Sequence, residues 1–223
     1  SRSVAESNQT SIRAGRIARA FGQALSNRQA MGYTLATTAI TGALFGFITS
    51  AQQIFFDIFD AADRFALMFG VMASGIAVAS LLNARLVERL GSRLLSHTAL
   101  FGFIAMAAIH AVVAFAGWES IWTFAVLQTL TMFFFGFIAG NFGAMAMEPM
   151  GHIAGTASAL QGFISATFGS LLGFYVGQHF DGTTRPFAVG LVVMGVMALG
   201  AVLFAEKGQL FKARHLPPAS AGG

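Results

Sequence analysis

The sequence predicts an all-α membrane protein whose six transmembrane helices form two inverted three-helix repeats. Hydrophobic residues make up 56% of the 223 positions and charged residues only 10%, whereas a soluble domain carries about 25% charged residues. The apolar residues also form long charge-free runs, and about 20 such residues cross a bilayer as a helix. The chain has 24 Phe and 26 Gly, which supply aromatic surface for lipid and small residues for close helix contacts.

The charge-free runs give the elements in order. We expect a cytoplasmic linker at 1–30, a six-helix transmembrane bundle at 31–205 and a cytoplasmic tail at 206–223. The expected spans are about 31–54, 65–84, 94–116, 121–147, 155–178 and 186–205. Trp118 and Trp122 flank the start of the fourth span, where they are placed as interfacial anchors. The fourth span breaks at Glu148–Pro149, and a short polar elbow leads into the fifth. The candidate functional residues of this elbow are Glu148, Pro149, Gly151, His152, Gly155 and Thr156.

Basic residues orient the spans. All 13 Lys and Arg residues except Arg64 and Arg185 lie in the N-terminal arm, the loop between the second and third spans, or the tail. The positive-inside rule therefore places both termini in the cytoplasm. This distribution also accounts for the sequence pI of about 10.3 without a nucleic-acid partner. Because the chain has no Cys, disulfides and thiolate metal sites are excluded.

Three landmarks indicate an internal repeat. The string Phe-Gly-Phe-Ile occurs at Phe45–Ile48 and again at Phe135–Ile138. Nearly the same separation relates the turn glycines Gly91 and Gly182, and the starts of the third and sixth spans. Because each unit contains three helices, the second copy enters the membrane from the opposite side, as in the inverted repeats of secondary transporters.

Polar and aromatic stripes mark candidate cavity walls on the first and fourth spans. Polar groups are costly in hydrocarbon unless they meet partners or water, so each stripe should turn inward. We expect them to line a substrate cavity for an amphipathic or cationic small molecule. The alternative is that they only join helices through hydrogen bonds. The residues are Thr41, Phe45, Thr49, Gln52, Phe56, Gln128, Thr131, Phe134, Asn141 and Met145.

The fifth span carries a stripe of small residues that predicts a close helix contact. Its expected members are Gly162, Gly169, Gly173 and Gly177. The contact is either a sliding seam between moving halves or a static packing of two helices. For His97 and His110 in the third span we expect interhelical hydrogen bonds or interfacial placement, because no carboxylate stands at helical spacing from them. No catalytic or metal-binding motif is present, so the sequence predicts a protein that is not an enzyme and needs no metal or cofactor.

Several segments are similar to one family. They are Asn27–Arg28, Met31–Tyr33, Gly42–Phe45, Leu82–Val87 and especially Glu148–Leu160. Together they resemble the C-terminal half of a Bcr/CflA-type drug:proton antiporter of the major facilitator superfamily. The resemblance implies one six-helix half of a major facilitator fold, in a bacterial inner membrane, with a missing N-terminal six-helix half as partner. It also implies efflux of drugs by alternating access, with the proton gradient as the energy source.

The resemblance assigns a gating loop to the segment between the second and third spans. Its residues Asn83, Arg85, Glu88, Arg89 and Arg93 resemble the motif G-x-x-x-D-R-x-G-R-R in degenerate form. Asn83 stands where Gly is usual, and Glu88 where Asp is usual. In the first span, the sequence Thr-Ser-Ala-Gln-Gln at 49–53 stands where relatives of this family often have Ser-Pro.

Two other functions remain open at this point. One is a metabolite or sugar carrier of the same superfamily, against which the aromatic cavity faces argue. The other is a non-transporting six-helix subunit, against which the repeat and the polar stripes argue. None of the nine acidic residues is expected at membrane depth, with Asp57 the deepest and Glu206 in the tail, so the proton carrier should lie in the missing half.

Overall fold

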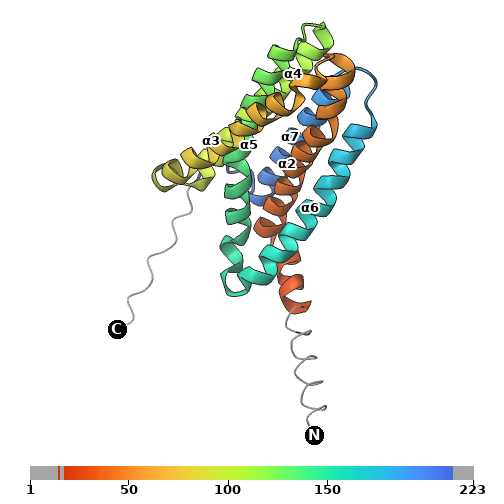
Figure 1. Ribbon diagram of the computed structural model, residues 1–223. Coiled ribbons are helices and arrows are strands. Elements are labelled where there is room, and N and C mark those ends of the chain that lie inside the picture. The colour runs from red at the N-terminus through yellow and green to blue at the C-terminus, as the bar shows by residue number, and fades with distance from the viewer. Residues whose placement is uncertain (1–14, 16–17, 213–223) are drawn as a thin grey trace, which may run out of the picture.

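A computed structural model of the chain describes residue 15 and residues 18–212, and the rest of the expected linker and tail lies outside the described residues. The described part is built of helices and their connections, which confirms the all-α prediction. The main helices are α2 (Arg28–Gln53), α3 (Phe65–Leu90), α4 (Ser92–Ala116), α5 (Ile121–Met147), α6 (Ala154–Gln178) and α7 (Arg185–Ala205) (Figure 1). Five stretches are long and apolar enough to cross a membrane, and one of them, Ile121–Gln178, contains both α5 and α6.

Side-chain caps mark where helices α2 and α5 begin. The Asn27 side chain accepts a hydrogen bond from the Ala30 amide at the start of α2, and Ser120 caps α5 through the Thr123 amide. Helix α2 ends in a π-helical turn, Ile54–Ile58, and a 3-10 turn, Ala62–Arg64, leads into α3. A 3-10 segment, Glu148–Ile153, forms the expected elbow between α5 and α6. Residues 18–26 form a further helix, whose Ala24 packs with Met150 and Ala157 near this elbow.

The connection between α3 and α4 is shorter than expected. Helix α3 continues to Leu90 instead of ending near residue 84, so most of the expected gating loop is helical. Only Gly91 separates the two helices, at a φ of 80° and a ψ of 151°. This conformation is open to glycine because it lacks a Cβ.

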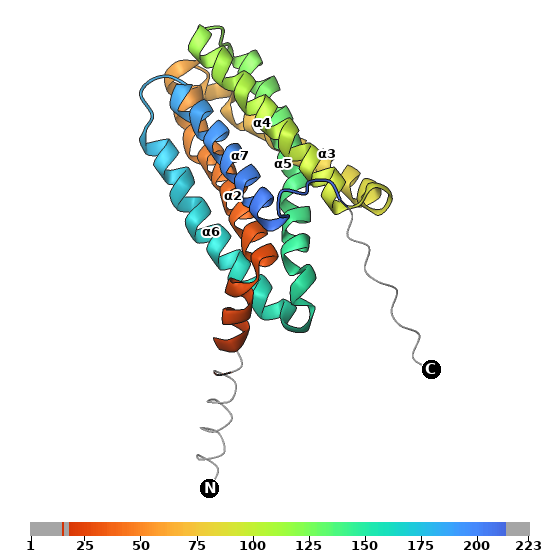
Figure 2. The same cartoon turned by 180° about the vertical axis from the view of Figure 1, so that it is seen from behind.

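Helix packing follows the repeat expected from the sequence. Helix α2 packs against α6 and α7, and α5 packs correspondingly against α3 and α4. The two central helices also contact each other, as do α4 and α7 (Figures 1 and 2). Exchanging the first three helices for the last three therefore reproduces these main contacts.

Small residues allow helices of one repeat to approach helices of the other closely. A Cβ added at Gly173 of α6 would lie 2.6 Å from the Gly46 amide nitrogen of α2. One added at Gly136 of α5 would lie 2.7 Å from the Ala79 Cβ of α3. Gly46 and Gly136 are equivalent positions of the repeated Phe-Gly-Phe-Ile string. The same kind of small-residue contact thus occurs twice, each time between a helix of one repeat and a helix of the other.

The expected glycine stripe is correct in part. Gly169, Gly173 and Gly177 lie against Thr41, Phe45 and Thr49 of α2, whereas Gly162 is exposed with no other atom near its Cβ position. Gly162 therefore lies outside the close contact between α6 and α2. The seam thus joins α2 and α6 within one six-helix bundle.

Candidate functional site

A cluster of buried polar side chains lies at the end of the bundle where α3 turns into α4. We call it the Arg93 cluster; it consists of Gln29, Tyr33, Arg93, His97, Glu148 and Glu206. Arg93 stands in the first turn of α4, Glu148 directly follows α5, and Glu206 directly follows α7. Gln29 and Tyr33 come from the first turns of α2. The cluster therefore joins the ends of four helices, two from each repeat.

Arg93 is the centre of the cluster and faces two carboxylates. Its Nη2 lies 2.7 Å from Glu148 Oε2 and its Nη1 lies 3.2 Å from Glu148 Oε1, which is the paired geometry that guanidinium and carboxylate groups favour. Its Nε donates to Glu206 Oε1 at 2.8 Å. The side chains of Arg93 and Glu206 are only 8% and 3% exposed, but that of Glu148 is 43% exposed. Water can therefore reach the Arg93–Glu148 pair far more easily than the Arg93–Glu206 pair.

A chain of hydrogen bonds extends from Glu206 to the start of the tail. Tyr33 Oη donates to Glu206 Oε1 at 2.7 Å and lies 2.9 Å from His97 Nε2. The amide of Phe211 donates to His97 Nδ1 at 3.1 Å. Because Nδ1 accepts this bond, the ring proton of a neutral His97 is on Nε2 and points to Tyr33. The expectation of an interhelical hydrogen bond for His97 is thereby met.

Gln29 closes the other side of the cluster. Its Nε2 donates to Glu148 Oε2 at 2.8 Å and to the Met145 carbonyl oxygen at 2.9 Å. The start of α2 is therefore tied directly to the end of α5. Since α2 and α5 are equivalent helices of the two repeats, this contact lies between the repeats.

The structure brings together one part of the expected gating loop and one part of the elbow. Arg93 and Glu148 form the ion pair described above, whereas Arg85, Glu88 and Arg89 are exposed at the end of α3. Asn83 accepts a hydrogen bond from Asn141 Nδ2 at 2.7 Å, which joins α3 to α5. Arg93 is thus the charged residue of the expected gating loop that pairs with the elbow.

The remaining elbow residues lie at the surface. Gly151, His152 and Gly155 are exposed, and Pro149 and Thr156 are half-buried. His152 Nε2 lies 3.3 Å from Gln23 Oε1 of the helix at 18–26. The elbow thus contacts the N-terminal helix through this pair and through Met150.

The expected cavity residues separate into two groups. Gln128, Thr131 and Met145 are fully buried inside the bundle, so they do not line a cavity open to a substrate. Phe134 packs on Gly102 of α4, and Asn141 is bonded to Asn83. In the described bundle α5 thus turns most of its polar stripe toward neighbouring helices, and a cavity wall on this helix stays a prediction.

The α2 stripe keeps more open surface. Gln52 and Phe56 are exposed, and Thr41 and Phe45 are half-buried at the seam with α6. Thr49 is exposed, but its hydroxyl also donates to the Gly173 carbonyl oxygen at 3.0 Å. The alternative that polar groups join helices therefore applies to Thr49, while Gln52 and Phe56 remain available to a ligand or a partner.

Sequence reasoning missed four members of the cluster: Gln29, Tyr33, His97 and Glu206. Glu206 was expected in a solvated tail, but the chain turns back after α7 and buries it. A signal was present, since Glu206 directly follows an apolar helix that ends at Ala205. Tyr33 carried no such signal, because its hydroxyl finds partners only through the tertiary fold.

The opposite end of the bundle has its own carboxylate contact. The Thr184 hydroxyl donates a hydrogen bond to Glu119, which joins the α4–α5 turn to the α6–α7 loop. Burial raises the pKa of the Glu119 carboxyl, although the hydrogen bond from Thr184 and the charge of Arg185 act in the opposite direction. This contact places Glu119 and Thr184 together, far along the helices from Arg93.

Comparison with known proteins finds two informative relatives. The chain is 26% identical over 196 residues to the uncharacterized MFS-type transporter YdgK of Bacillus subtilis, a match that covers 85% of this chain and 46% of that protein. It is 29% identical over 200 residues to the bicyclomycin resistance protein homolog of Haemophilus influenzae, covering 86% of this chain and 49% of that protein. No family model and no solved structure matches.

The chain thus spans about half the length of the curated relatives that it matches. Both matches extend over most of the chain, and one relative carries a Bcr-type drug-resistance name. These similarities agree with the resemblance drawn from the sequence: over most of its length the chain is similar to about half of a protein named as an MFS-type transporter and of one named as a bicyclomycin resistance homolog.

Proposed function

We propose that the chain is the C-terminal half of a proton-coupled drug efflux transporter that works by alternating access. The Arg93 cluster is the observation that carries this proposal. It fastens the two repeats to each other at one end of the bundle, through an ion pair that is partly open to water. The similarity to a protein named as a bicyclomycin resistance homolog favours drugs as the substrate class.

The cluster has the properties of a conformational latch. Arg93 and Glu206 are buried together, so separating them would leave charges in a poorly solvated site. The Arg93–Glu148 pair is more accessible, and water can replace its two bonds when the helix ends move apart. One end of the bundle would thus open and close while the Arg93–Glu206 pair stays intact.

The face left open on α2 supplies the proposed substrate surface. Gln52 and Phe56 are exposed in the six-helix bundle, and Phe45 is half-buried beside them along the same stripe. The missing half would cover this face and enclose a cavity with an aromatic wall. Hydrophobic cations would bind there by stacking and cation–π contacts.

Reconstitution tests the proposal. Proteoliposomes that contain only the 223-residue chain should show no drug uptake when a proton gradient is imposed, because the proton carrier is expected in the other half. Co-reconstitution with the N-terminal half should restore uptake. Gradient-driven transport by this chain alone, or none by the two halves together, would contradict the proposal.

A further inference from the structure

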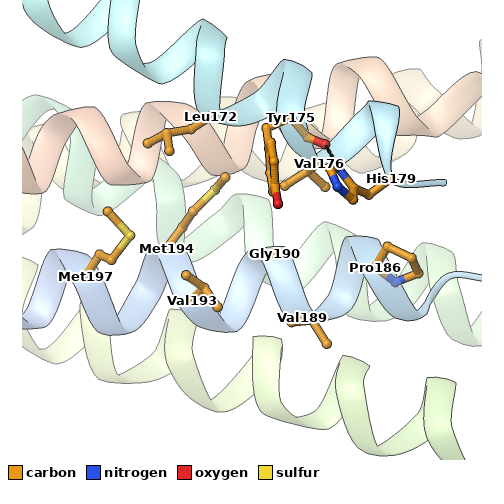
Figure 3. A pocket seen from close by; sticks show the side chains of 10 residues that line it. All are labelled: Leu172, Tyr175, Val176, His179, Pro186, Val189, Gly190, Val193, Met194 and Met197. Carbon is orange, nitrogen blue, oxygen red and sulfur yellow. Dashed lines mark hydrogen bonds between the residues drawn. The ribbon is translucent and has the colours of Figure 1, made fainter.

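Helices α6 and α7 enclose an apolar groove at the end of the bundle near the 179–184 loop. The groove has a volume of about 340 Å³ (Figure 3). The two helices follow each other in sequence but make few contacts with each other, since each packs mainly on α2. Figure 3 shows side chains from both helices directed into the space between them. The lining residues are Leu172, Tyr175, Val176, His179, Pro186, Val189, Gly190, Val193, Met194 and Met197.

The floor of the groove rests on glycines of α2. A Cβ placed on Gly42 would lie 3.0 Å from the Leu172 Cβ and 3.3 Å from the Met194 sulfur. A Cβ added at Gly190 of α7 would lie 2.7 Å from Cγ2 of Val176 in α6. The floor is therefore closed by tight packing, and the opening faces away from α2 along the exposed side chains Val189, Val193 and Met197.

The walls exclude water as a stable occupant. The side chains that line the groove are aliphatic or thioether groups except for Tyr175 and His179. An apolar cavity of this kind does not hold ordered water, because water needs two to four polar partners. Helix α7 and the stretch Ile121–Gln178, which contains α6, are long and apolar enough to cross a membrane, so we expect hydrocarbon around the groove.

The dimensions fit one lipid chain. On α7 the groove extends from Pro186 to Met197, which corresponds to about 17 Å at 1.5 Å per residue. That length is close to half of the hydrocarbon core, which is about 30 Å thick. A neighbouring helix is about 10 Å across, so less than one turn of it would fill 340 Å³. The occupant is therefore thinner than a helix and as long as one leaflet.

The polar pair at the end of the groove lies where a headgroup would be. Tyr175 lies in the last turn of α6 and His179 directly follows the helix, and their ring centroids are 4.0 Å apart. His179 Nδ1 is 2.8 Å from the Tyr175 carbonyl oxygen, which fixes the ring at the mouth of the groove. Aromatic side chains with polar tips gather at membrane interfaces. Their position sets the direction of the chain, with the headgroup beside the 179–184 loop.

From this geometry we infer that the α6–α7 groove is a binding site for one acyl chain of a membrane phospholipid, drawn from the leaflet that borders the 179–184 loop. The Tyr175–His179 pair contacts the ester and headgroup region. The site is separate from the substrate surface proposed on α2, and it does not depend on transport.

Native mass spectrometry tests the inference with matched tryptophan variants. The 223-residue chain is delipidated in detergent and titrated with 1-palmitoyl-2-oleoyl-phosphatidylethanolamine. Val193→Trp fills the groove, whereas Val196→Trp changes a side chain of similar exposure, 54% against 49%, outside the lining. We expect one retained lipid in the wild type and in Val196→Trp, and at least tenfold weaker retention in Val193→Trp. Equal retention in the two variants overturns the assignment.

A second measurement avoids bulky substitutions. Because the chain has no Cys, Met197→Cys and Val112→Cys can each carry a single fluorescent label, in the groove and on the outer face of α4. One equivalent of chain-brominated lipid in detergent should quench the label at 197 and leave the label at 112 unchanged. Equal quenching, or displacement of the lipid by the hydrophobic cation tetraphenylphosphonium, would overturn the lipid assignment.

Discussion

At the residue scale, Arg93 carries more of the structure than any other charged side chain in the described part of the chain. It is the basic residue that pairs with both Glu148 and Glu206, and it ties α4 to the ends of α5 and α7. A buried guanidinium is stable only when its charge and its donors are met. Its three hydrogen bonds to these carboxylates meet that condition.

Replacing this residue should lower stability strongly. We expect Arg93→Ala to cost about 3–5 kcal/mol, as is typical when one partner of a buried ion pair is removed. The measurement is the thermal unfolding temperature of the purified protein in detergent. Arg89→Ala is the matched control, because Arg89 is exposed one turn earlier, and its unfolding temperature should stay unchanged. Similar values for the two variants would show that the cluster contributes little.

At the element scale, the seam between α2 and α6 allows a sharp test. A Cβ at Gly173 would lie 2.4 Å from the Phe45 Cβ and 2.6 Å from the Gly46 amide nitrogen, so α6 would have to move away from α2. Gly173→Leu should therefore lower the unfolding temperature and the yield of monodisperse protein. Gly162→Leu, on the same helix with nothing near its Cβ position, should behave like the wild type. A stable Gly173→Leu variant would mean that the helices are farther apart than described.

Helices are also the level at which the sequence was most informative. Long charge-free runs and the punctuating residues Gly91, Gly117 and Pro149 located them, because hydrocarbon tolerates few charges and these residues interrupt helices. The facing of side chains was harder to predict. Gln128 and Thr131 follow the periodicity of a cavity wall, but the same periodicity serves a buried helix contact. The partner helix decides between the two, and it is not encoded locally.

At the scale of the whole molecule, the contacts show which connections share an end of the bundle. Gly91, the elbow and the start of the tail meet around Arg93, while Glu119 and Thr184 meet at the other end. Glu206 belongs to the first end because it directly follows α7, and its place after an apolar helix was the sequence signal for this position.

The orientation of these ends in the membrane is a testable prediction. Reporter fusions at Arg19, Gly91 and Gly208 should report the cytoplasm, and those at Asp60, Glu119 and Gly182 the outside, because the basic residues gather at the first end. Activity of a cytoplasmic reporter at Gly182 but not at Gly91 would reverse the assignment. Mixed signals within one end would contradict the six-span topology.

The position of Glu206 has a consequence for biosynthesis. Arg93 emerges from the ribosome early in the bundle, but Glu206 follows the final helix and is translated more than one hundred residues later. Once Glu148 has been translated, the guanidinium can pair with it, but it cannot yet pair with Glu206. The buried pair therefore forms only after the last span has been synthesised, and a nascent chain stopped before residue 206 lacks one of the two carboxylates that hold its helix ends together.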